Sequence, residues 1–181
     1  MLKNVIAIAS LAGILSLSSV GLSQALPTAV AKGQLQVGGG WTYAEPDYGQ
    51  KAIQGVSGYA DFDFARHIGI EASGHWLSVI TPTDLGENSI LFGPRFIMHP
   101  GRFDLYGKAL FGIGDIDIQE VQDNPQGGAG SYFAYGVGGG VDLRATRHIN
   151  VRVFDFEYQH WGYQTGLTPA VFTVGAAYRF R

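Results

Sequence analysis

The stretch AVFTVGAAYRFR (residues 170–181) places an apolar side chain at every second position. These side chains belong to Phe172, Val174, Ala176, Tyr178 and Phe180, and the residues between them are small, polar or charged. Alternate side chains of a β-strand lie on one face of it. The stretch therefore predicts a strand whose unbroken aromatic and aliphatic face requires an apolar surface to contact.

The composition of the whole chain is typical of one β-rich domain. Of its 181 residues 46% are hydrophobic and only 15% are charged, and 27 are glycine, about twice the usual share of roughly 7%. The absence of cysteine excludes a disulfide framework and a thiolate metal site. With a net charge of −3 and scattered Lys and Arg residues, we expect no nucleic-acid partner.

The amino terminus predicts a secretory signal peptide over residues 1–25. It has one cation, Lys3, then an apolar run from Val5 to Val20, and then the small-x-small site Ser23-Gln24-Ala25. The alternative is a permanent anchor, but four serines interrupt a run that is short for a membrane span. A second small-x-small site at residues 29–31 leaves the cut after Ala25 or Ala31. The mature domain is expected over residues 26–181.

Seven further segments share the period-two alternation, which predicts strands with two different faces. They cover residues 34–43, 56–64, 68–76, 90–98, 103–113, 133–144 and 149–161. With the closing strand, the chain has eight predicted strands.

Aromatic residues gather near the expected strand ends, where rings suit the lipid–water interface. These residues are Trp41, Tyr43, Phe62, Phe64, Phe103, Trp161, Tyr178 and Phe180.

The connections between these segments alternate in length. Three are tight turns, at residues 65–67, 99–102 and 145–148, and four are longer, at residues 45–51, 78–88, 115–130 and 162–169. Short turns at one end and long loops at the other are the plan of an outer-membrane barrel with both termini on the periplasmic side. The predicted fold is all-β: an eight-stranded antiparallel up-and-down transmembrane β-barrel preceded by a cleavable signal peptide.

The alternative is a soluble, lipocalin-like barrel, which Gly39-Gly40-Trp41 weakly supports through the G-x-W pattern. In that arrangement the apolar face would point inward. Eight strands enclose too little room for so many rings. The apolar face is therefore expected in lipid, and the charged face in the lumen.

Charges of both signs are expected inside the barrel, where each must be paired or solvated. We expect a salt-bridged lumen network of Asp61, Glu71, Arg95, Lys108, Asp142, Arg152, Asp155 and Glu157. Four more charges share the inward parity: Asp63, Asp104, Arg144 and Arg179. Inward glycines at positions 93, 112, 136, 138 and 140 are expected to leave room for large Arg and Tyr side chains.

The seventh segment needs one irregularity to fit this arrangement. Val151 and Val153 share one parity, whereas Phe154, Phe156 and Tyr158 take the other. A β-bulge near Val153 and Phe154 would turn every charge of the segment inward. The alternative is a regular strand with Asp155 and Glu157 in lipid, which is costly.

Catalytic, cofactor-binding and metal-binding residues are not indicated. The glycine run 136–140 lacks the helix and the Lys-Ser or Lys-Thr of a phosphate loop. A lipid A-modifying barrel enzyme would need a nucleophile and base on the lipid face, where His160 is the only histidine expected near the outer rim. His67, His99 and His148 fall in the short turns, and His75 points inward.

The chain resembles the small outer-membrane β-barrel family with an OmpA-like or porin-like barrel domain. The resemblance covers roughly residues 33–180 and is carried by GYADFDFARHIGIEASGHW (58–76), LFGPRF (91–96), YGKALFGIG (106–114) and VRVFDFEYQHW (151–161). It implies that the barrel assembly machinery reads a terminal aromatic residue with alternate apolar positions before it. Phe172, Tyr178 and Phe180 match that assembly signal, and Arg181 departs from it by following the final aromatic residue. The peptidoglycan-binding domain of the longer relatives has no counterpart, so cell-wall tethering is not implied.

The expected function is a structural and surface-presentation role in the Gram-negative outer membrane, without enzymatic activity or cofactor and with a largely closed lumen. The first alternative is a narrow pore or a ligand-binding surface protein; the minor ones are the lipid A-modifying enzyme and a secreted lipocalin-like binder. Expected partners are outer-membrane lipid, the assembly machinery and an extracellular partner at the acidic 115–130 loop. We expect a monomer.

Overall fold

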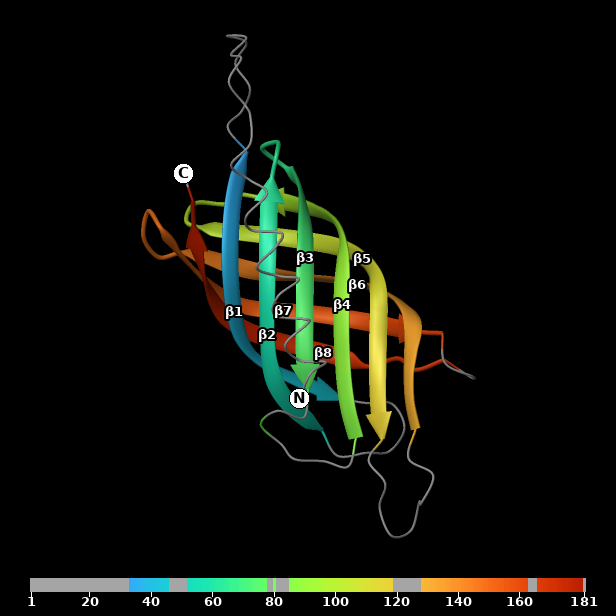
Figure 1. The fold of residues 1–181 in the computed structure, drawn as a ribbon. Helices are drawn as coiled ribbons and strands as arrows, with labels where there is room; N and C mark the ends of the chain where they lie inside the picture. Colours follow the sequence, from blue (N-terminus) through green and yellow to red (C-terminus); the bar gives the residue numbers. More distant parts are fainter. Residues whose placement is uncertain are drawn as a thin grey trace, which may run out of the picture. The chain divides into compact units, whose positions relative to one another are not determined.

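Eight antiparallel strands close into one barrel in the computed structural model (Figure 1). The structure describes residues 33–45, 52–77, 80, 85–118, 128–162 and 166–180. The expected signal peptide and the tips of the long loops lie outside these residues. No helix in the described ranges is long and apolar enough to cross a membrane.

Each strand pairs with its sequence neighbours, and β1 pairs with β8 to close the ring. The strands are β1 (Gln34–Glu45), β2 (Ile53–Asp63), β3 (Ile68–Leu77), β4 (Leu85–Met98), β5 (Phe103–Ile118), β6 (Gly128–Arg144), β7 (Ile149–Trp161) and β8 (Ala170–Arg179). The all-β, up-and-down barrel expected from the sequence is therefore confirmed.

Several strands extend further toward the long loops than the sequence predicted. Asp115 pairs with Ser131 and Ile118 with Gly128, so the expected 115–130 loop begins and ends as a β5–β6 hairpin. Residues 85–88, expected in a loop, belong to β4. A ladder of backbone hydrogen bonds needs no apolar outer face once it has left the lipid, so the outward-facing apolar residues end before the strand does.

The outer face of the barrel is apolar and the inner face carries the charges. The exposed large hydrophobic residues include Trp41, Phe62, Trp76, Phe92, Phe111, Val174 and Tyr178. The eight residues of the expected lumen network are each at most 6% exposed. This distribution excludes the lipocalin-like arrangement.

Strand β7 contains the expected irregularity. Its register against β8 shifts between Arg152 and Asp155, and both Val153 and Phe154 are exposed. Arg152, Asp155 and Glu157 are buried. The bulge is confirmed, and the alternative with acidic side chains in lipid is wrong.

The sequence misplaced Trp161. It was expected in the interfacial aromatic girdle, but only 1% of its surface is exposed, because the bulge gives Trp161 the same inward parity as Asp155 and Glu157. Gly114 on β5 makes space for it, since a Cβ atom there would lie 2.6 Å from the indole ring.

Candidate functional site

Two arginines hold two aspartates in the half of the lumen nearest the short turns. Nη1 of Arg95 lies 2.5 Å from Oδ2 of Asp61, and its Nη2 lies 2.9 Å from Oδ2 of Asp142. Nη2 of Arg152 lies 2.9 Å from the same oxygen of Asp61, and its Nε lies 3.1 Å from Oδ1 of Asp142. These four residues come from β2, β4, β6 and β7, so the pairs tie strands together across the lumen.

Tyrosine rings stack on both guanidinium groups. Cζ of Arg95 lies 3.9 Å from the centre of the Tyr106 ring, and Cζ of Arg152 lies 3.6 Å from the centre of the Tyr59 ring. A cation over an aromatic face is attracted by the ring quadrupole, most strongly where water is excluded. The sequence analysis gave neither tyrosine a role, although both have inward parity.

Lys108 is surrounded by three carboxylates. Its Nζ lies 2.7 Å from Glu71, 2.8 Å from Asp155 and 2.7 Å from Glu157. Tyr106 also donates a hydrogen bond to Asp155. Because Arg152 reaches Glu71 at 3.4 Å, the lysine cluster and the arginine cluster form one continuous network.

The network contains all eight residues expected from the sequence. Five of them are acidic and three basic, so with every carboxylate ionised and His75 neutral its formal charge is −2. Neutral groups complete the set: Gln36 donates to Asp61 at 2.5 Å and accepts from Asn150 at 2.6 Å. The four further inward charges lie closer to the turns. Arg144 pairs with Asp104 at 3.3 Å, and Arg179 donates to Gln34 at 2.7 Å.

A chain of polar contacts leads from the network toward the long loops. His75 lies 3.3 Å from Glu157, Gln159 donates to Glu157 at 2.9 Å, and Trp161 donates to Gln159 at 2.9 Å. The indole nitrogen is thereby satisfied while the ring remains in an apolar environment.

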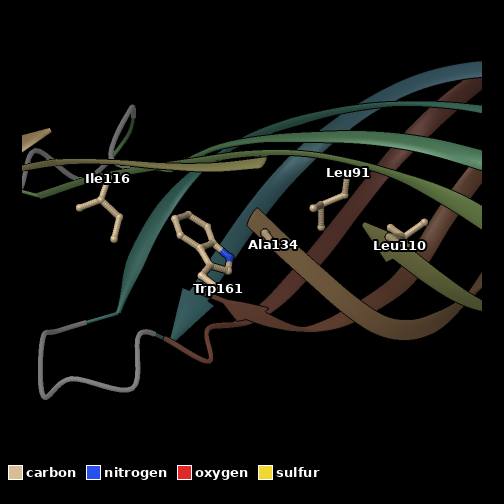
Figure 2. Close-up of a cluster of buried hydrophobic side chains, with 5 residues drawn as sticks. All are labelled: Leu91, Leu110, Ile116, Ala134 and Trp161. Atoms are coloured by element: carbon tan, nitrogen blue, oxygen red, sulfur yellow. The ribbon is translucent and has the colours of Figure 1, made fainter. Parts of the chain in front are cut away.

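Above this chain the lumen holds a cluster of buried apolar residues, together with the buried Glu87 and Ser89 of β4. Trp161 packs with Leu91, Leu110, Ile116 and Ala134, as Figure 2 shows, and we call these five residues the apolar cap. A second buried cluster joins β1, β2, β3 and β8; it consists of Ala44, Ile53, Leu77 and Val171. The sequence predicted the salt-bridged lumen network but no apolar layer, because it placed Trp161 at the lipid–water interface.

The inward glycines serve a different purpose from the one expected. A Cβ atom at Gly93, Gly112 or Gly138 would lie 2.0–2.1 Å from a backbone oxygen of the neighbouring strand. Only Gly140 of the five faces a large ring, with Oη of Tyr106 2.6 Å from that position. The glycines therefore mainly permit close strand approach.

Clusters of metal-ligating side chains are absent from the part of the chain that the structure describes. Within that part, no group of three His, Asp or Glu side chains is placed to hold a metal ion. His160 points outward, with its ring centre 5.1 Å from that of Tyr135.

A family model described as "Outer membrane protein beta-barrel domain" matches residues 12–180. The chain belongs to this family. As a member of the outer membrane protein beta-barrel family, it is a protein of the bacterial outer membrane, and the apolar outer face is its lipid surface.

Solved structures of small outer-membrane proteins share the fold. Ail, the attachment invasion locus protein of Yersinia pestis, is 18% identical with a TM-score of 0.55, covering 82% of this chain and 97% of Ail. Neisserial surface protein A is 14% identical with a TM-score of 0.57, covering 81% and 95%. OprG of Pseudomonas aeruginosa is 13% identical with a TM-score of 0.55, covering 82% and 96%. At such identities the likeness concerns the fold alone. No significant match was found among curated proteins.

Proposed function

We propose that this member of the family is a non-enzymatic structural barrel that presents its long loops on the cell surface and conducts no ions. The observation that carries the proposal is the filling of the lumen by two successive layers. The ion-paired network occupies the half nearest the turns, and the apolar cap lies between it and the loops.

Two spaces in the described part of the lumen are too small for a water-filled path. Between Tyr59, His75, Arg152 and Thr173 there is no room for a water molecule. Near the turns, a space of about 20 Å³ beside Asp63, Arg95 and Asn150 holds about one water. Permanent aqueous channels are found in barrels with about 16 strands. These features favour a closed barrel over the narrow-pore alternative.

The surroundings of His160 on the lipid face support the proposal that the barrel is not an enzyme. A lipid-modifying reaction needs a base positioned by an acid beside a nucleophile. Within the described residues His160 has an aromatic neighbour, Tyr135, and no carboxylate partner. This environment suits an interfacial ring better than a catalytic base.

A surface partner at the 115–130 loop remains the alternative function. One Ail structure holds the heparin analogue sucrose octasulfate, a polyanion. The loop of this chain contains Asp115, Asp117, Glu120 and Asp123 and no Lys or Arg. Like charges repel, so we expect any partner of this loop to be neutral or cationic.

Maturation and assembly are proposed from the sequence. We expect removal of residues 1–25, recognition of Phe172, Tyr178 and Phe180 by the assembly machinery, and a monomer in the membrane. In support of the assembly signal, Tyr178 and Phe180 are both about half exposed on the lipid face, with ring centres 4.9 Å apart.

Two measurements test the proposal. The purified barrel, folded as judged by a gel band that shifts only on boiling, should give no stepwise conductance in planar bilayers. Steady conductance steps that disappear after boiling would establish the narrow pore instead. An epitope tag inserted at residues 119–127 should be accessible on intact cells, whereas the same tag at Thr146 should not; the reverse pattern would contradict surface presentation.

A further inference from the structure

The end of the barrel with the short turns is rich in arginine: Arg66, Arg102, Arg144, Arg147 and Arg179 lie there, together with Asp63 and Asp104. In the sequence, the segments in or beside the long connections contain one lysine, Lys51, and eight acidic residues: Glu45, Asp47, Asp84, Glu87, Asp115, Asp117, Glu120 and Asp123. The sequence analysis treated the cations as scattered, because only the barrel brings the three turns to one end.

Four of these arginines line one cleft. It lies between the β4–β5 turn, the β6–β7 turn and the end of β8, has a volume of about 370 Å³, and is lined by Gly101, Arg102, Arg144, Thr146, Arg147 and Arg179 among others. We call it the arginine cleft. By the orientation of the barrel it opens on the periplasmic side.

The backbone around the arginine cleft is held by hydrogen bonds. The amide of Arg144 donates to the carbonyl of Arg102 at 2.9 Å, which joins the two turns. Oγ1 of Thr146 accepts from the amides of His148 and Ile149 at 3.2 and 3.0 Å. The cleft is therefore formed before any ligand arrives.

Two of the four guanidinium groups are available to a ligand. Arg144 already donates to the carbonyl of Gly101 and pairs with Asp104. Arg102 and Arg147 are exposed, and their side chains have no partner among the described residues. Guanidinium groups match phosphate oxygens with forked, charge-assisted hydrogen bonds.

The cleft lies at the boundary of the lipid face. Phe103, directly after Arg102, is 45% exposed, and Tyr178, directly before Arg179, is 51% exposed. The Tyr178 ring stacks on His148 with ring centres 5.7 Å apart. Aromatic belts mark the level of the lipid headgroups. A lipid bound here would therefore meet guanidinium groups at its headgroup and apolar side chains of the barrel along its acyl chains.

We propose that the arginine cleft binds the headgroup of an anionic phospholipid from the periplasmic leaflet. Arg102 and Arg147 hold the phosphate, and the acyl chains lie along the outer face beside Phe103 and Tyr178. An acidic peptide would use the cations but not the adjoining apolar surface. This site goes beyond the structural role proposed above, since it assigns the barrel a preferred lipid.

The test uses the full mature chain folded in neutral detergent micelles. Native mass spectrometry follows the binding of dioctanoyl phosphatidylglycerol, with dioctanoyl phosphatidylcholine as the zwitterionic reference. We expect a preference for the anionic lipid that Arg102→Gln or Arg147→Gln each lowers about five-fold. Arg66→Gln is the matched control, because Arg66 is an exposed arginine of the β2–β3 turn, outside the cleft. This variant should change the preference less than two-fold.

Three outcomes would overturn the proposal. Unchanged preference in both cleft variants removes the site, and an equal loss in Arg66→Gln shows diffuse attraction to the whole basic end. Competition by inorganic phosphate at the same concentration as the lipid shows a site for a free anion. The boiling-dependent gel shift is recorded for every variant, so a failure of the barrel to fold is distinguished from a failure of the site.

Discussion

Arg152 on β7 and Asp61 on β2 form an ion pair of 2.9 Å across the lumen, although β8 and β1 separate their strands along the wall. Both side chains are at most 2% exposed. Such a pair contributes to stability mainly through what its loss leaves behind, because an unpaired buried charge is far more costly than a missing contact.

Replacing Arg152 with Leu should therefore lower the melting temperature of the folded barrel. The change removes one of the cations that hold Asp61, Asp142 and Glu71, and it leaves the Tyr59 ring without its cation. Breaking a buried pair costs about 3–5 kcal/mol. Circular dichroism in detergent measures the melting curve, with Arg147→Leu at an exposed position as control. An unchanged curve for Arg152→Leu would contradict the interpretation that the buried ion pairs of the lumen network stabilise the barrel.

The lysine cluster predicts a coupling between two substitutions. Lys108→Met leaves three carboxylates facing one another, so it should be strongly destabilising. Adding Glu157→Gln removes one of those charges, and the double variant should recover about 1 kcal/mol or more relative to Lys108→Met alone. Urea unfolding of the wild type, both single variants and the double variant measures this. Strictly additive effects would show that the three carboxylates do not share Lys108.

Gly140 and Gly107 offer a comparison of two glycine-to-alanine changes in adjacent strands. At Gly140 the added methyl group would meet the Phe154 carbonyl at 2.3 Å and the Tyr106 hydroxyl at 2.6 Å. At Gly107 its nearest neighbour would be 3.9 Å away. Overpacking of this kind costs about 1–3 kcal/mol, so Gly140→Ala should lower the urea midpoint and Gly107→Ala should not. Equal midpoints would mean that both the Phe154 carbonyl and the Tyr106 side chain can move aside freely.

The bulge in β7 predicts which residue the strand can lose. Deleting Val153 leaves Arg152, Phe154 and Asp155 in regular alternation, opposite Gly175, Val174 and Thr173 of β8. The lumen charges keep their facing, so this variant should still fold, with a boiling-dependent gel shift.

Deleting Phe156 is the matched control for that variant. It shifts every later residue by one position and turns Glu157 toward lipid, where a charge is costly. This variant should fail to fold. If it folds and the Val153 deletion does not, the assigned position of the bulge is wrong.

The sequence predicted the features that parity alone determines. The facing of Asp61, Lys108 and Arg152 followed from alternation, and the bulge followed because Asp155 and Glu157 had to leave the lipid. The parity of a residue says which face of the strand it lies on, but neither its position along the barrel axis nor the side chains that it contacts. The stacking of Arg95 on Tyr106 needs two strands brought together. After Ile113 the outward parity carries Asp115 instead of an apolar residue, so the lipid-facing pattern does not reveal the rest of the hairpin. Trp161 was the avoidable error, since the expected bulge already implied its inward facing.

The distribution of the lumen network over the wall bears on how the barrel closes. Its ion pairs lie on strands β2 to β7, whereas the side chains of β1 and β8 contribute a Thr42–Thr173 hydrogen bond of 3.0 Å and a hydrogen bond of 2.7 Å from Arg179 to Gln34. A sheet open between β1 and β8 can thus already match charges of β3 to β7, as in the pairs of Lys108 with Glu71 and Asp155. Ring closure then completes the backbone ladder at the seam and the Arg152–Asp61 pair, which joins the strands on its two sides.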